Sequence, residues 1–153
     1  MDLFFGTDLP KKVIDCLFNA TDESLEDLKL WGKTREECVE HIQESVRDGL
    51  IYLVYQDNIC LLFLDKTPYT IYLSMILTPE SKQNKVVRIL KETFTMFQEK
   101  TDVHKVELAT SCPELHPILT RCGFRQEGTF IDSRRLPTGV FVDEFYYGYL
   151  VDV

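Results

Sequence analysis

The hydrophobic pattern of the chain changes its period once, near residue 80, and this change limits the folds available to it. Before the change, three strand-length segments follow one another at 50–55, 59–64 and 70–77, and the first two flank a turn-like segment at 56–58. After it, apolar residues recur at helical spacing and predict a helix from Gln83 to Lys100 whose buried face holds Val86, Leu90, Phe94 and Phe97. A meander followed by one long amphipathic helix predicts a mixed α/β or α+β domain, with a central, mostly antiparallel sheet flanked by helices.

The segment before the meander is predicted to be helical. Residues 9–18 place Val13, Ile14, Leu17 and Phe18 on one face, and a short second helix is expected at 24–30. Thr34 and Glu37 have the spacing of a capping box, which starts a third helix with a stripe of Cys38, Ile42 and Val46. Gly49 is then placed to end that helix in a left-handed conformation.

The last third alternates between strands and one short helix. A strand is expected at 103–109, and Pro113 suits the first position of a short helix that ends at Gly123. Two closing strands are expected at 124–131 and 140–151. Residues 1–153 therefore have the length and pattern of a single domain.

Composition and net charge argue against several classes of function for this chain. The formal net charge of −8 disfavours binding to nucleic acid or to an anionic membrane, because cationic contacts to phosphate supply most of such affinity. No apolar stretch approaches a membrane span, and residues 1–5 lack the basic start of a secretory signal. The five cysteines are odd in number and show no CxxC pair, so we expect a cytoplasmic protein with neither disulfides nor a metal site.

Residues 113–128 carry a resemblance to a known family. The sequence PELHPILTRCGFRQEG is similar to the helix, Gly-Phe step and Glu-Gly pair of the GNAT acetyltransferases, and the closing VDEFYYGYL resembles the last strand of many members. The resemblance implies the GNAT fold, with acetyl-CoA as the cofactor if the site is functional. It also implies that the coenzyme pyrophosphate binds where the third strand of the meander leads into the long helix.

That segment departs from the family pattern. The family carries Gln/Arg-x-x-Gly-x-Gly/Ala there, and the matching residues are Lys82, Gln83, Asn84, Lys85, Val86 and Val87. Lys85 and Val87 replace the two glycines, and we expect their side chains to lie on the surface where glycines would let the backbone approach a phosphate. Lys82, Lys85 and Arg88 keep the start of the helix cationic, which leaves anion binding by side chains open.

The proton-transfer groups also differ from the family pattern. Leu119 occupies the position of the tyrosine that protonates the leaving thiolate in many members, and Cys112 occupies that of an asparagine. Tyr72 and Glu107 are the catalytic candidates, and Glu107 is also explained as a solvated carboxylate on a strand. His104, His116 and Cys112 are further titratable residues for which a structural role is the simpler interpretation.

Two functions follow as hypotheses. The first is a GNAT-fold protein with a degenerate acetyl-CoA site, non-catalytic, which binds a protein partner or forms part of a virion. Residues 30–34 with the 52–64 hairpin are similar to small GNAT-like proteins of tailed phages, which would place the chain in the host cytoplasm or the virion. The second is an acetyl-CoA-dependent N-acyltransferase that acetylates an amine of a protein or small molecule. A homo-oligomer is compatible with the aromatic closing strand.

Overall fold

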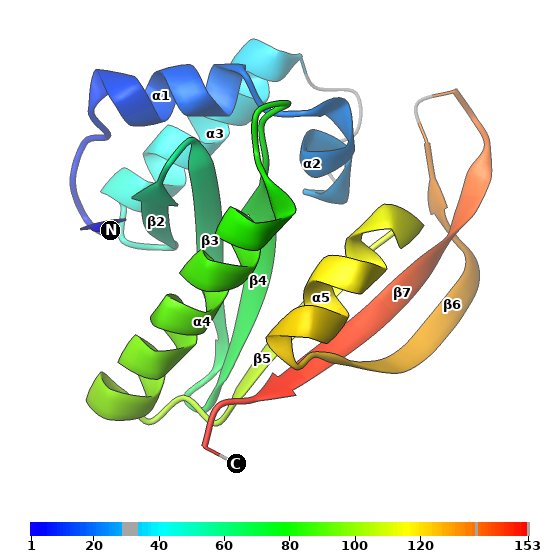
Figure 1. Cartoon of the computed structure of the whole chain (residues 1–153). Helices are drawn as coiled ribbons and strands as arrows, with labels where there is room; N and C mark the ends of the chain where they lie inside the picture. The colour runs from blue at the N-terminus through cyan, green and yellow to red at the C-terminus, as the bar shows by residue number, and fades with distance from the viewer. Residues whose placement is uncertain (29–33, 137, 153) are drawn as a thin grey trace. The chain divides into compact units, whose positions relative to one another are not determined.

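The structure is a computed structural model that describes residues 1–28, 34–136 and 138–152. It contains one seven-stranded sheet in the order β1-β2-β3-β4-β5-β7-β6, with helices on its sides (Figure 1). All the strand pairs with a defined register are antiparallel except β4 and β5, which run parallel. The predicted class, a mixed α+β fold with a mostly antiparallel sheet flanked by helices, is confirmed.

The described chain divides into two compact units, and the expectation of a single domain over 1–153 stays a prediction. The first unit contains residues 1–64 and 74–81, and the second contains residues 65–73 and 82–153. Strands β3 (Ile59–Thr67) and β4 (Thr70–Ile76) contribute residues to both units.

The first unit consists of a few strands covered by short helices. Its other elements are β1 (Asp2–Phe4), α1 (Lys11–Phe18), α2 (Asp22–Asp27), α3 (Arg35–Arg47) and β2 (Tyr52–Gln56). The core joins side chains of α1 and α3 to the facing side chains of the strands, among them Val13, Leu17, Val39, Leu53 and Leu62. Burying apolar side chains from both layers is the main force that holds the helices on the strands.

Several local predictions in this unit are confirmed. Thr34 Oγ1 accepts a hydrogen bond from the Glu37 amide at 3.2 Å, so the capping box forms at the start of α3. Gly49 follows that helix with a φ of +70°, and Asp57 and Asn58 form the tight turn between β2 and β3 with positive φ values. Two details differ: β1 was not predicted, and Phe18 is exposed while Cys16 takes its place on the buried face of α1. Residues 30–33, which carried part of the phage resemblance, lie outside the described residues.

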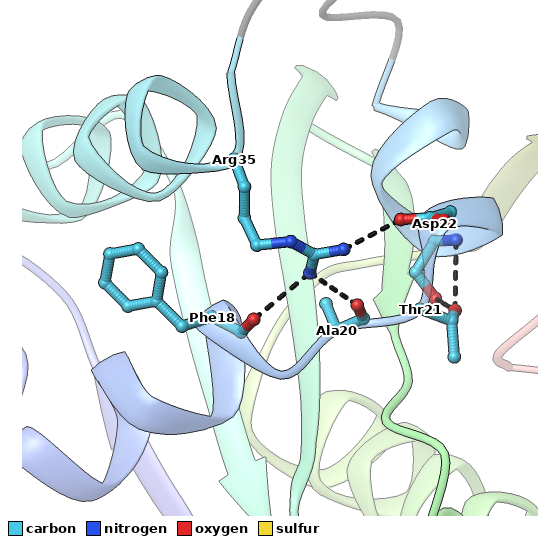
Figure 2. A network of polar contacts seen from close by, with 6 residues as sticks. Phe18, Ala20, Thr21, Asp22 and Arg35 are labelled. Carbon is cyan, nitrogen blue, oxygen red and sulfur yellow. Dashed lines mark hydrogen bonds and ion pairs between the residues drawn. The ribbon is translucent and has the colours of Figure 1, made fainter.

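Arg35 ties three elements of this unit together (Figure 2). Its guanidinium donates to the backbone oxygens of Phe18 and Ala20 at the end of α1, and to the Asp22 carboxylate in the first turn of α2. Helix ends leave backbone carbonyls without partners inside the helix, and a guanidinium can satisfy several acceptors at once. Arg35 therefore fixes where α1 ends and α2 begins relative to the start of α3.

The second unit packs two helices on one face of its strands. It contains α4 (Gln83–Lys100), β5 (Lys105–Thr110), a short 3-10 helix (Pro113–Leu115), α5 (His116–Cys122), β6 (Arg125–Arg135) and β7 (Phe141–Leu150). The predicted bounds of α4 and its buried face of Val86, Leu90, Phe94 and Phe97 are confirmed. The Phe94 ring stacks on Tyr149 of β7 with 4.5 Å between centroids, which fixes α4 against the sheet.

Gly123 ends α5 as predicted, and its conformation explains why a glycine is needed. Its φ is +97°, a backbone conformation that residues with a side chain rarely adopt. An added Cβ would also lie 3.1 Å from the Tyr149 ring. Phe124, the next residue, is buried and contacts the rings of Phe94 and Tyr149. The Gly-Phe step thus turns the chain and fills the core in the space of two residues.

Candidate functional site

The first turn of α4 carries the residues predicted to bind the coenzyme pyrophosphate. Lys82 is the exposed N-cap residue, and its carbonyl accepts from the Val86 amide at 3.1 Å. The amides that precede Val86 in a helix point out of its start, and the helix dipole places partial positive charge there. This end of α4 therefore attracts anions by its backbone alone.

A residue from another helix adds to this positive charge. Arg121 of α5 donates to Gln83 Oε1 at 3.2 Å and to Asn84 Oδ1 at 2.8 Å. A guanidinium at the positive end of a helix is electrostatically unfavourable, and these two side-chain amide oxygens hold it in place. With the exposed Lys82 and the half-buried Lys85, Arg121 gives the start of α4 three cations. The sequence alone did not place Arg121 in this site, because it lies 37 positions from Asn84 in the chain.

Of the two residues that replace the family glycines, Val87 lies differently from what was expected. The side chain of Val87 is 7% exposed, and its backbone oxygen accepts from the Cys122 thiol of α5. Val86 is also buried. The expectation that Val87 would cover a phosphate-facing surface is therefore wrong, since helical periodicity directs this side chain into the unit. Lys85 is half-buried.

The catalytic candidates Tyr72 and Glu107 lie side by side. They are register partners of the parallel strands β4 and β5, so their side chains leave the sheet on one face. The neighbours Val106 and Leu108 are buried on the opposite face, which carries α4. The register defined between these strands joins residues 70–72 to residues 105–107, while β4 continues to Ile76 and β5 to Thr110.

Glu107 is an ion-paired carboxylate rather than a simply solvated one. Its Oε2 lies 2.7 Å from Lys66 Nζ, and its Oε1 lies 3.7 Å from Lys105 Nζ. Lys105 also contacts Glu127 of β6 at 2.7 Å, and this hydrogen bond is the main cause that raises the pKa of Lys105. The Glu107 carboxylate is therefore held between two lysine side chains, on the face of the sheet that also carries Tyr72. Its role as a base stays a prediction.

A second pair of titratable groups joins α5 to β7. His116 Nδ1 lies 3.0 Å from the phenol oxygen of Tyr147, and His116 Nε2 lies 3.4 Å from Thr120 Oγ1. Tyr147 is 2% exposed, and burial raises the pKa of its phenol, whereas His116 is exposed. Residues 116 and 119 share one face of α5, so the pair lies one helical turn from Leu119. The sequence showed both residues, but only the topology brings them together.

The remaining candidates have structural contacts. His104 Nδ1 lies 2.6 Å from Asp152 Oδ1, and this hydrogen bond lowers the pKa of the exposed Asp152. Cys112 precedes the proline of the 3-10 helix, and its amide donates to Thr110 Oγ1 at 3.0 Å. Leu119 is fully buried, in keeping with a packing role.

Among residues 1–28, 34–136 and 138–152, no group of three or more His, Cys, Asp or Glu side chains is placed to hold a metal ion. None of the helices in the same residues is long and apolar enough to span a bilayer.

Solved structures of similar architecture cover nearly the whole chain. An acetyltransferase of the GNAT family from Bacillus anthracis aligns with a TM-score of 0.72 at 14% identity, over 96% of this chain and 94% of the other. The chain has the GNAT fold. Spermidine N-acetyltransferase from Vibrio cholerae, in complex with CoA and spermine, gives a TM-score of 0.69 at 14% identity over 97% and 94%. RimL, a ribosomal L7/L12 alpha-N-protein acetyltransferase in complex with coenzyme A, gives 0.70 at 16% identity over 99% of both chains.

Comparison of the amino-acid sequence with known families and curated proteins does not identify the fold. No protein-family model matches it, and no curated protein matches it. At 14–16% identity, the similar structures establish the GNAT fold of this chain, and its chemistry is inferred from its own residues.

Proposed function

We propose that the chain is an acetyl-CoA-dependent N-acyltransferase that acetylates an amine of a protein or small molecule. The observation that carries this proposal is the position of Arg121, which α5 supplies to the first turn of α4. In the GNAT fold this is the end of the long helix that the sequence resemblance assigns to the coenzyme pyrophosphate. Together with Lys82 and Lys85, Arg121 concentrates positive charge where a pyrophosphate would bind, which supports a coenzyme site that works without the glycines.

The residues at the start of α4 can bind a pyrophosphate without the glycine-rich loop of the family, through backbone amides and cationic side chains. The amides of Gln83, Asn84 and Lys85 offer donors along the helix axis. Arg121 and Lys82 supply charge-assisted hydrogen bonds, which are stronger than neutral ones. Because Val87 is turned into the unit, its side chain does not compete with an anion at the surface. When bound, acetyl-CoA would supply the thioester from which the acetyl group is transferred.

The chain's own groups can hold the protons that acyl transfer to an amine requires. An amine must lose a proton and a thiolate must gain one. Glu107, which pairs with Lys66 and Lys105, is the candidate acceptor of the amine proton. Tyr147 holds a proton on its buried phenol, and the exposed His116 can return one to it from solvent. The formal charge of −8 favours a cationic amine as the acceptor.

Calorimetric titration with acetyl-CoA tests the coenzyme site. We expect binding in the micromolar range for the unmodified chain, and a Kd raised about 10–100-fold in Arg121→Ala, because charge-assisted hydrogen bonds contribute about 1.5–3 kcal/mol. Arg47→Ala is the matched control, since Arg47 is an exposed arginine that pairs with Asp8 in the first unit. Absence of binding at millimolar acetyl-CoA would refute the proposal.

A non-catalytic, protein-binding role is the second candidate function. The observation in its favour is that β6 and β7 expose large apolar side chains: Phe130 and Ile131 in the middle of β6, and Phe141 at the start of β7 with Val140 just before it. Large apolar side chains left exposed on a strand pair can contribute to a protein interface. If acetyl-CoA does not bind while Phe130→Ser with Phe141→Ser abolishes self-association or partner capture, this candidate replaces the first.

A further inference from the structure

Two buried cysteines of the first unit face each other. Cys16 lies on α1 and is 3% exposed, and Cys60 lies on β3 and is fully buried. The Cys60 thiol donates a hydrogen bond to Cys16 Sγ, with 3.6 Å between the sulfur atoms. Both belong to the cluster of apolar side chains that holds α1 and α3 on the strands. The contact joins residues that are 44 positions apart in the sequence, so the fold and not local spacing creates it.

We propose that Cys16 and Cys60 are an oxidation site, at which a peroxide or a low-molecular-weight disulfide converts the two thiols into an intramolecular disulfide. The sequence expectation of a reduced protein without disulfides describes the resting state, and the proposal adds a second, oxidised state of the same chain. It does not depend on the proposed enzymatic function.

The geometry requires only a small movement. A disulfide has a sulfur–sulfur distance of about 2.05 Å, so the two sulfur atoms must approach by roughly 1.5 Å. Side-chain rotation together with a slight shift of α1 can supply that distance. Cys122 has a different neighbour, since its thiol donates to the backbone oxygen of Val87.

The reaction with hydrogen peroxide balances in two steps. The Cys16 thiolate attacks one peroxide oxygen, the O–O bond breaks, and the products are a Cys16 sulfenic acid and, after protonation, one water. The Cys60 sulfur then attacks Cys16 Sγ, the S–O bond breaks, the S–S bond forms, and a second water leaves. Two thiols are oxidised by two electrons in total, and one peroxide is reduced to two waters. With a low-molecular-weight disulfide, the Cys16 thiolate attacks one of its sulfur atoms and displaces one thiol, and Cys60 then displaces the second thiol from the mixed disulfide, so one disulfide forms as another is reduced.

The order of attack follows from the hydrogen bond between the thiols. Donation by Cys60 lowers the pKa of Cys16, although burial and the Glu80 carboxylate oppose this effect. The same hydrogen bond and burial raise the pKa of Cys60. Because the thiolate is the nucleophile, Cys16 is the sulfur that reacts first and Cys60 the one that resolves.

Access to the thiols depends on the opening of α1. This helix has eight residues, its N-cap Pro10 makes no side-chain capping bond, and its first turn carries no acidic residue. Short helices of this kind are marginally stable by themselves and open locally. We therefore expect oxidation to be slow and to follow the opening rate of α1.

The crosslink has a consequence beyond the two cysteines. The segment after α1 is bonded to the end of β4: the Thr21 amide donates to the Leu77 oxygen at 2.8 Å, and the Leu77 amide donates to Ser24 Oγ at 3.0 Å. Asn19 also donates to the Glu80 carboxylate at 3.2 Å. Fixing α1 to β3 therefore restrains residues 19–24 and residues 77–80 together.

Peptide mapping after oxidation of the folded chain tests this proposal. The purified chain is treated with hydrogen peroxide or oxidised glutathione, alkylated, and digested without reductant. We expect a loss of two hydrogens in the intact mass and a linked peptide pair that contains Cys16 and Cys60. We also expect a Tm raised by about 5–10 °C and reversed by dithiothreitol, because the link constrains the unfolded chain. Hydrogen exchange should slow in α1 and at Leu77.

Two variants separate this site from other thiols. Cys60→Ser should abolish the mass loss, while Cys112→Ser should leave it unchanged. If Cys60→Ser does not fold, the mapping of the unmodified chain still decides the question. The proposal is overturned if Cys16 and Cys60 are recovered as free thiols after oxidation of the folded chain, or if their link appears only in denaturant.

Discussion

The Nδ1 atom of His116 lies 3.0 Å from the phenol oxygen of Tyr147, which connects an exposed imidazole on α5 to a buried phenol on β7. Leu119, one turn along the same helix, stands where GNAT acetyltransferases that the chain resembles have a tyrosine. Tyr147 of β7 therefore offers a phenol one helical turn from Leu119, and the proposed function uses it as the proton donor. Because burial raises its pKa, Tyr147 stays protonated at neutral pH and can act as a proton donor.

Tyr147→Phe tests this assignment within the proposed function. The variant keeps the ring and loses the hydroxyl, so we expect kcat for acetyl transfer to fall by about 100-fold while the Kd for acetyl-CoA stays unchanged. Steady-state kinetics and calorimetry on the same preparation measure the two quantities. Tyr146→Phe is the control, because Tyr146 leaves β7 on the opposite face and packs on Phe130. Equal kcat for Tyr147→Phe and the unmodified chain would exclude a role for the phenol in proton transfer.

The sequence predicted those structural features that depend on residues close together in the chain. The capping box at Thr34, the ends of α4 and the left-handed Gly123 all follow from residues close together in the chain, and the structure shows each of them. The contacts that build the candidate site join residues far apart. Arg121 with Asn84 depends on how α5 packs against α4, and His116 with Tyr147 depends on how α5 packs on β7, which no local pattern encodes.

The missed strand β1 and the wrong prediction for Val87 have physical reasons of the same kind. Strand β1 has three residues and exists because residues 53–55 of β2 offer it a partner, so its own sequence carries little strand signal. The direction of Val87 was misjudged by comparison with a glycine in the family motif. The helical period of its own segment, in which Val86, Val87 and Leu90 are buried together, predicts it correctly.

Replacing Arg35 should destabilise the first unit more than its partial exposure suggests. Arg35→Ala removes the donor to two backbone oxygens at the end of α1 and to Asp22, so we expect the free energy of unfolding to fall by about 1–3 kcal/mol. Urea denaturation followed by circular dichroism measures the change. Arg47→Ala should lower the free energy of unfolding much less, because its contact with Asp8 is an exposed ion pair that solvent screens. An equal loss of unfolding free energy in the two variants would contradict a stabilising role for the Arg35 hydrogen bonds shown in Figure 2.

The buried ion pair between Arg134 and Glu144 should show strong coupling. Arg134 Nη2 lies 2.8 Å from Glu144 Oε2, with side-chain exposures of 1% and 6%, and Arg134 also donates to Ser111 at the end of β5. Removing one partner leaves a buried charge uncompensated, so Arg134→Met and Glu144→Gln should each cost about 3–5 kcal/mol. The double variant should cost much less than the sum of the two. Additive losses in this double-mutant cycle would show that the pair contributes no coupling.

Stability at alkaline pH should depend on Cys122. Burial raises the pKa of its thiol from 9.0 to about 11 in the folded chain. Between these two pH values the unfolded chain releases the thiol proton while the folded chain keeps it, so the folded state binds more protons and loses stability as the pH rises. A difference of about two pKa units corresponds to a loss of about 2–3 kcal/mol across that window. Urea midpoints measured from pH 8 to 10.5 under reducing conditions should fall less steeply in Cys122→Ala than in the unmodified chain. Cys112→Ala, which removes a half-buried thiol, should follow the unmodified chain, and parallel pH profiles for all three proteins would rule out Cys122 as the responsible group.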